Sequence, residues 1–239
     1  MTTISNALQA VHDRIARIAA QCGRDPRTIR LLAVSKSFGP DLIRAAHGCG
    51  QRAFGESYVQ EALGKIDRLR DLDIEWHFIG PIQSNKTRPL AERFAWVHGV
   101  DREKIARRLS EQRPNGMAPL NVCLQVNVSG EASKSGVVPA EVESLARTVA
   151  ALPGIHLRGL MAIPEPTEDV ALQRARFGML RELKERLAAG GLTLDTLSMG
   201  MSADLEAAVM EGATIVRVGS AIFGERQPLH HRDTEAQRG

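Results

Sequence analysis

Large apolar side chains recur at helical spacing near the start of the chain. The positions are Ile4, Leu8, Val11, Ile15 and Ile18. Because successive intervals are four, three, four and three residues, these side chains share one face of a helix. The pattern stops at Gly23 and Pro26, residue types that commonly end helices. We therefore predict an amphipathic helix at the N-terminus.

After this segment, short apolar runs alternate with longer helical patterns. The short runs predict strands at residues 30–35, 52–54, 74–79, 95–99, 121–127, 156–161, 195–198 and 214–218. The helical patterns between them include residues 41–47, 58–69, 103–112, 140–152, 170–189 and 204–212.

Alternation of strands and helices is typical of parallel strands joined by crossover helices. Eight such units in about 200 residues match a small TIM-type barrel. We predict an α/β protein with a single (β/α)8 barrel and an extra N-terminal helix. A doubly wound open sheet is the competing fold, which pattern counting separates only weakly. The barrel domain is expected over residues 1–229, followed by a flexible polar tail at 230–239.

Composition narrows the classes of function. The 239 residues are 43% apolar and 25% charged, which is ordinary for a globular protein. Lysine and arginine exceed aspartate and glutamate by only 31 to 28, and nine residues are aromatic. This balance does not argue for nucleic-acid binding. The seven histidines show no metal-ligand spacing, so no metal site is predicted.

The cysteines and apolar runs indicate the compartment. Cys22, Cys49 and Cys123 are odd in number and form no C-x-x-C pair, so a disulfide framework is not expected. No stretch has the length and apolar character of a membrane span, and the N-terminus has no apolar signal core. We expect a cytoplasmic monomer that binds no membrane.

Lys36 follows a predicted strand and precedes Gly39-Pro40. Leu32, Val34 and Lys36 share one strand face. In a barrel, that alternation would place Lys36 at the C-terminal mouth, where barrel enzymes keep their chemistry. Partial desolvation there favours the neutral amine, which attacks an aldehyde to form a Schiff base. A solvated surface lysine is the competing interpretation.

Two loops near the other end of the chain have the character of anion sites. Residues 198–202, SMGMS, precede a helix predicted to begin near Ala203, where free backbone N–H groups favour an anion. Gly219 and Ser220 follow the last predicted strand. In many barrels the loops after strands seven and eight hold a phosphate. An ordinary capped loop and a tight barrel-closing turn remain open alternatives.

Pyridoxal 5′-phosphate is one ligand that satisfies both an aldehyde-binding lysine and a phosphate cup. Arg217 shares a strand face with Gly219, so it is placed to face the pyridine nitrogen. A guanidinium cannot accept a proton and would keep that nitrogen unprotonated. The ring would then be a poor electron sink, which disfavours carbanion chemistry. A salt-bridged barrel arginine is the alternative.

At this point the chain resembles a known family. The matching stretches are AVSKS (33–37), FGESYVQEA (54–62), WHFIGPIQSNK (76–86), QVNVSGEASKSG (125–136), GLMAI (159–163), LSMGMSADLEAAV (197–209) and VRVGSAIFG (216–224). Together they are similar to the pyridoxal phosphate homeostasis proteins, also called the YggS or proline-synthetase co-transcribed family. Seven matches in order along the chain are more specific than any single motif.

The resemblance implies a barrel like the N-terminal domain of alanine racemase, carrying pyridoxal phosphate on Lys36. It implies phosphate contacts from Ser198, Met199, Gly200, Ser202, Gly219 and Ser220, with Arg217 at the ring nitrogen. Family members are regarded as carriers or regulators of vitamin B6 without established catalysis. PLP-dependent apoenzymes are the partners such a role implies. Ser57 departs from the family motif, which usually has asparagine at this position.

Three further side chains are candidates for the cofactor pocket. Ser57 follows the second predicted strand, and His77 shares a strand face with Ile79. Met161 ends another predicted strand and is placed to pack on the ring. A hydrogen-bonded core histidine and a plain core methionine are the competing interpretations of His77 and Met161.

Competing functions use the same lysine differently. A fold-type III PLP enzyme, such as an amino-acid racemase or decarboxylase, adds a β-rich domain with a catalytic tyrosine. About twenty residues follow the last predicted strand here, and the single tyrosine, Tyr58, is predicted to lie in a helix. A cofactor-free aldolase would use Lys36 as its own nucleophile, and a scaffold that binds a partner protein or nucleic acid would not need it.

Overall fold

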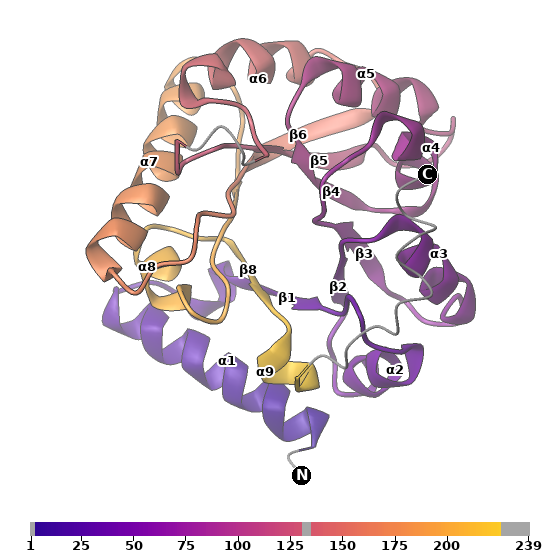
Figure 1. Ribbon diagram of the computed structural model, residues 1–239, viewed down its shortest axis with the longest axis vertical. Coiled ribbons are helices and arrows are strands. Elements are labelled where there is room, and N and C mark those ends of the chain that lie inside the picture. Colours follow the sequence, from indigo (N-terminus) through magenta and orange to yellow (C-terminus); the bar gives the residue numbers. More distant parts are fainter. Residues whose placement is uncertain (1–2, 131–134, 226–239) are drawn as a thin grey trace.

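Eight parallel strands close into a barrel at the centre of the computed structural model, which describes residues 3–130 and 135–225 (Figure 1). The strands are β1 (Arg30–Val34), β2 (Ala53–Glu56), β3 (Glu75–Phe78), β4 (Trp96–Val100), β5 (Leu120–Gln125), β6 (Ile155–Met161), β7 (Thr196–Ser198) and β8 (Ile215–Val218). β8 pairs with β1 from Arg30↔Ile215 to Ala33↔Val218 and closes the ring. The predicted barrel is confirmed, and the open sheet is excluded.

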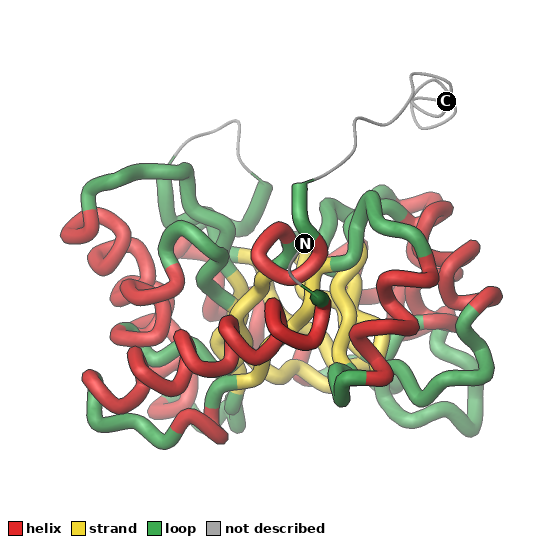
Figure 2. Tube along the Cα trace, turned by 90° about the horizontal axis from the view of Figure 1, so that it is seen from below, coloured by secondary structure: helices red, strands yellow, loops and turns green. Residues whose placement is uncertain are grey.

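Helices surround the strands in the described part of the chain (Figures 1 and 2). They are α1 (Ile4–Gln21), α2 (Pro40–Gly48), α3 (Val59–Arg68), α4 (Thr87–Arg93), α5 (Glu103–Gln112), α6 (Val142–Ala150), α7 (Val170–Ala189), α8 (Leu205–Met210) and α9 (Ser220–Phe223). Short 3-10 turns are η1 (Pro26–Thr28), η2 (Ser84–Lys86) and η3 (Pro139–Glu141). Apolar spacing does not predict α9, because one turn is too short to show a period.

Helix α1 is the predicted extra helix. Thr3 caps it by accepting a hydrogen bond from the Asn6 N–H at 3.3 Å, and its apolar face is buried. The helix packs against α2, α8 and α9. Arg14 of α1 donates to the carbonyl of Ser202 at 3.0 Å and pairs with Glu206. The N-terminal helix thus braces the loop that follows β7.

Alternating strand residues divide the apolar core in two. Phe54, Phe78 and Val97 belong to the large cluster that packs against the surrounding helices. Leu32 and Val34 belong to a separate cluster inside the barrel, together with Ala53, Ile79, Trp96, Cys123, Met161 and Ile215. Because side chains alternate along a strand, Arg217 shares the inward face of Ile215. The inward direction predicted for Leu32 and Val34 is confirmed.

One predicted helix begins at a different residue, and the predicted tail cannot be compared with the structure. The helix expected near Ala203 begins at Leu205, because the Asp204 carboxylate accepts the Met201 N–H at 2.5 Å and holds a turn there. The predicted tail at 230–239 lies outside the described residues. In the described ranges, no helix combines the length and apolarity needed to cross a membrane.

Candidate functional site

A cavity of about 680 Å³ opens at the ends of the strands where barrel sites normally form. All eight strands are parallel, so their C-terminal ends share this face. Six of the predicted site residues line the cavity: Lys36, Ser57, Ser202, Arg217, Gly219 and Ser220. The lysine and the two predicted phosphate loops, distant in sequence, therefore meet in one space.

The backbone on both sides of Lys36 is held from outside the barrel. Ser37 has φ of +68°, the only positive φ of a residue other than glycine in the described chain. Its N–H donates to the Glu61 carboxylate at 2.6 Å. On the other side, the Lys65 ammonium of α3 donates to the Ser35 carbonyl at 2.7 Å. Strained conformations of this kind persist where surrounding contacts fix them. Here the contacts from Glu61 and Lys65 fix the backbone on both sides of Lys36.

These contacts belong to a buried charged cluster, which we call the outer network: Ser35, Glu56, Glu61 and Lys65. Lys65 Nζ lies 2.7 Å from Glu56 and 2.5 Å from Glu61. The Ser35 hydroxyl donates to Glu56 at 2.6 Å. Burial raises the pKa of Glu56 to about 7, although the Lys65 charge opposes the shift.

The β8 side approaches the lysine strand closely. A Cβ added to Gly219 would lie 3.0 Å from the Val34 carbonyl oxygen, so glycine lets the end of β8 pack beside the end of β1. Ser220 begins α9, and Ser202 lies in the loop that Arg14 braces. Both serines line the cavity with Lys36, so their hydroxyls are candidate hydrogen-bond donors for a ligand bound there.

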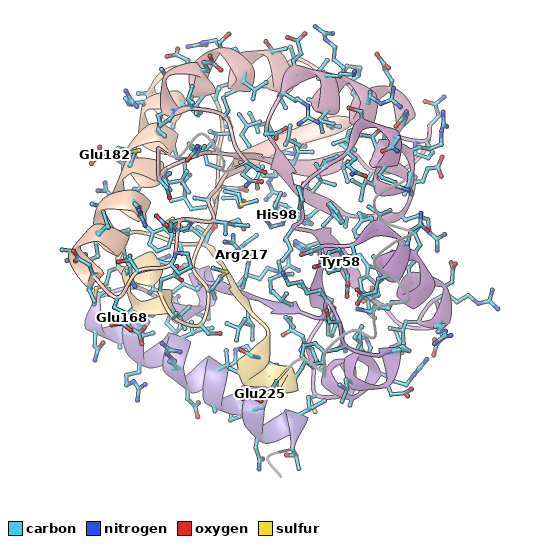
Figure 3. All side chains as sticks on the ribbon, viewed as in Figure 1. Tyr58, His98, Glu168, Glu182, Arg217 and Glu225 are labelled. Atoms are coloured by element: carbon cyan, nitrogen blue, oxygen red, sulfur yellow. The ribbon has the colours of Figure 1, made fainter. Side chains whose placement is uncertain are left out.

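Arg217 supplies a cation to the cavity. Its side chain is 3% exposed and donates to the Ser198 carbonyl, the Ser198 hydroxyl and the Ala162 carbonyl at 2.7, 2.9 and 2.8 Å. No carboxylate of the described residues pairs with it, which sets aside a salt-bridged arginine. Burial lowers the pKa of Arg217 to about 10, so the guanidinium stays charged at neutral pH. Figure 3 places Arg217 and His98 within the ring of strands.

The other five predicted residues are not among those that line the cavity: His77, Met161, Ser198, Met199 and Gly200. Met161 lies in the apolar cluster inside the barrel. The Ser198 hydroxyl bonds to His98 and Arg217, and His77 bonds to His98 and Glu75. Gly200 packs on α8, where a Cβ would come within 2.4 Å of Ala208. Direct cofactor contacts from these five stay predictions.

Four contributors to the site are not among the residues that the sequence predicts for it. Lys65 and Glu61 follow the recognised Gly55-Glu56 motif and lie four residues apart in α3, a spacing that signals a pair. His98 alternates with Trp96 on the inward face of β4, but nothing local marks its partner. Tyr58, which the sequence predicts within a helix, instead precedes α3 as its N-cap and lines the cavity.

The fold and the cavity together define a barrel of the alanine racemase N-terminal class. Residues 7–227 match the family model described as "Alanine racemase, N-terminal domain". Alanine racemase from Corynebacterium glutamicum superposes with a TM-score of 0.67 at 19% identity, over 94% of this chain and 64% of that one. At that identity the likeness concerns the fold alone.

Closer relatives specify the family further. The pyridoxal phosphate homeostasis protein of Pseudomonas aeruginosa is 62% identical, over 95% of this chain and 97% of its own length. The protein of the same name from Escherichia coli K12 is 49% identical, over 95% and 98%. PipY of Synechococcus elongatus, solved with PLP bound, has a TM-score of 0.76 at 38% identity, over 88% and 99%. The chain belongs to the family of pyridoxal phosphate homeostasis proteins.

Proposed function

We propose that this protein binds pyridoxal 5′-phosphate in the cytoplasm, holds it on Lys36 through a Schiff base, and serves vitamin B6 homeostasis without turnover. PLP-dependent apoenzymes are the proposed recipients of the cofactor. The observation that carries the proposal is that Lys36, Arg217, Ser202 and Ser220 line one cavity. PipY, which is similar over nearly its whole length, was solved with PLP bound.

The donor set of the cavity fits this cofactor. The Lys36 amine can add to an aldehyde carbon, after which water leaves and a C=N bond remains. Ser202 and Ser220 offer hydroxyl donors to a phosphate, and glycine at 219 keeps the backbone open to it. Arg217 can only donate, so it would hold a ring nitrogen unprotonated. PLP supplies an electron sink to amino-acid chemistry when its ring is protonated, and this arrangement favours storage over turnover.

Removing the lysine tests the covalent link. Purified Lys36→Ala should be folded but colourless, and should lose PLP on dialysis. Lys86→Ala is the matched control, because Lys86 is the other lysine in the cavity lining; it should stay yellow. Borohydride reduction followed by peptide mass mapping should place the modification on residue 36. Retention of colour by Lys36→Ala, or its loss only in Lys86→Ala, would overturn the assignment.

The phosphate contacts need a separate test. Ser202→Ala removes one hydroxyl donor and should weaken PLP retention about tenfold, the size expected for a hydrogen bond to a charged group. Gly219→Val should weaken it more, since the added atoms would meet Val34. Equilibrium dialysis measures both. Equal retention in the two variants and the wild type would contradict the placement of phosphate at these loops.

Tyr58 favours one alternative function. It lines the cavity with Lys36, so a lysine and a tyrosine border the same space, as an amino-acid racemase needs. Incubation of the PLP-loaded protein with single amino-acid enantiomers decides between the two. The homeostasis proposal expects no useful racemisation or decarboxylation, and no change with Tyr58→Phe. A rate that Tyr58→Phe abolishes would support the enzyme instead.

A further inference from the structure

A continuous line of polar side chains crosses the interior of the barrel. We call it the inner chain: Glu75, His77, His98, Ser198 and Arg217. His77 Nε2 lies 2.6 Å from Glu75 Oε1, and His77 Nδ1 lies 2.9 Å from His98 Nε2. His98 Nδ1 lies 2.8 Å from Ser198 Oγ, which accepts from Arg217 at 2.9 Å. Both histidines and Ser198 are fully buried.

The inner chain joins the two ends of the barrel. Glu75 begins β3 at the amino-terminal end, where its side chain is 33% exposed and pairs with Arg30 at 2.6 Å. Arg217 lies at the other end and lines the cavity. The links pass from β3 to β4 and then across to β7 and β8, strands that are not neighbours of β4. The connection therefore runs through the interior.

Charges at the two ends set the direction of every hydrogen bond. Partial burial acts to raise the pKa of Glu75, but the bond from His77 and the charge of Arg30 outweigh it and lower the pKa to about 2. Glu75 is thus an acceptor, so His77 carries its proton on Nε2. Burial lowers the pKa of both histidines, which makes them neutral. His77 Nδ1 must then accept from His98 Nε2, and His98 Nδ1 must accept the Ser198 hydroxyl proton.

We propose that His98 and His77 are positioning residues for the cofactor ring. Through Ser198 they form a one-way hydrogen-bond chain that fixes the orientation of Arg217. Because Ser198 donates its only hydroxyl proton to His98, its oxygen can act toward the guanidinium only as an acceptor. Three N–H groups of Arg217 are held in this way by Ser198 and Ala162. Arginine has five N–H groups, so two are left for a ligand in the cavity that Arg217 lines.

The stacked ring of Trp96 supports this arrangement. It lies parallel to His77, 5.4 Å between centroids and 5° between planes, and Arg158 covers its ring at 4.8 Å. His77 cannot rotate away without breaking this stack. The tautomer and the orientation of the imidazole are therefore both fixed, as is usual where an outer partner orients a functional group.

The tautomers can be tested without PLP. In the PLP-free wild type at pH 7, long-range ¹H–¹⁵N correlation spectra should show His77 and His98 as neutral imidazoles protonated on Nε2. His12, exposed on α1, serves as the reference for a histidine in water. A proton on His98 Nδ1, or a doubly protonated His77 at pH 7, would reverse the chain and overturn the proposal.

A matched pair of variants tests the link to the cofactor, a step that rests on the proposed function. His98→Gln keeps an acceptor for Ser198 and a donor for His77, whereas His98→Leu keeps volume but no polar atom. His98→Leu should weaken PLP retention about tenfold, the loss expected for one hydrogen bond to a charged group, and shift the visible absorbance maximum. His98→Gln should restore both toward the wild type.

The outcomes separate the two proposals. If the wild type binds no PLP, the proposed function fails, while the tautomer assignment is still decided by the spectra of the PLP-free protein. If the wild type binds PLP and both His98 variants keep its absorbance maximum and affinity, the positioning role is wrong. If His98→Leu does not fold, His98→Gln is compared with Ser198→Ala instead. The same loss of PLP affinity and the same shift of the absorbance maximum in these two variants would contradict the proposed hydrogen-bond direction.

Discussion

Two buried polar networks flank the cavity, and they are built on opposite principles. The outer network, outside the barrel wall, places an ammonium between two carboxylates within 2.7 Å. The inner chain keeps its charges at its ends and neutral histidines between them. The outer network holds the backbone beside Lys36, whereas the inner chain holds the side chain of Arg217. A substitution that breaks the outer network leaves a buried charge without its partner. A substitution that breaks the inner chain leaves the Arg217 side chain without a fixed orientation.

The largest expected effect therefore belongs to the outer network. Lys65→Met should lower the free energy of unfolding by about 3–5 kcal/mol at pH 8, because it strands buried carboxylates without their cation. Urea denaturation measures it. Lys104→Met, at an exposed position of α5, is the control and should cost less than about 0.5 kcal/mol. A small, equal change in both variants would show that the outer network adds no stability.

The pH dependence of stability should have opposite signs in the two networks. The pKa of Glu56 is raised to about 7, so its folded form binds a proton more tightly than the unfolded chain. Its contribution is present below about pH 4.5 and is lost as the pH rises through about 7. The pKa of Glu75 is lowered to about 2, so its contribution is present above about pH 4.5 and is lost as the pH falls toward 2.

Two isosteric variants isolate these contributions. Relative to Glu56→Gln, the wild type should lose about 3 kcal/mol between pH 4.5 and 7.5, which is about 2.5 pKa units of linkage. Relative to Glu75→Gln, it should lose stability only below about pH 4.5. Urea midpoints at a series of pH values provide the measurement. If the stability of the wild type relative to the two variants changed with pH in the same direction, the proposed difference between the networks would be wrong.

The comparison also shows what the sequence could and could not reveal. The eight strands and the inward direction of Leu32 follow from local patterns of burial and turn residues. The position of Lys36 at the mouth of the barrel follows from its place just after a predicted strand. The hydrogen bond of His98 cannot be predicted in this way, because its partner Ser198 lies 100 residues away. Lys65 likewise bonds to a carbonyl 30 residues distant. The sequence predicts Ser198 as a phosphate contact at the end of a strand, and only the closed barrel shows that its hydroxyl bonds to His98 and Arg217.

The smallest expected effect concerns Ser37, the strained residue next to Lys36. A side chain in the left-handed region costs about 1–2 kcal/mol, whereas glycine there costs roughly 0.4–1 kcal/mol through the entropy of the unfolded chain. Ser37→Gly should therefore raise the free energy of unfolding by no more than about 1 kcal/mol, and Ser37→Val should lower it by about 1–2 kcal/mol because a β-branched side chain fits this conformation poorly. Urea denaturation resolves the order of the three proteins. The glycine variant should keep PLP, since the bond from the residue 37 N–H to Glu61 needs no side chain. If glycine were the least stable of the three, the backbone at this position would not be under strain, and the outer network would bind the lysine loop without constraining it.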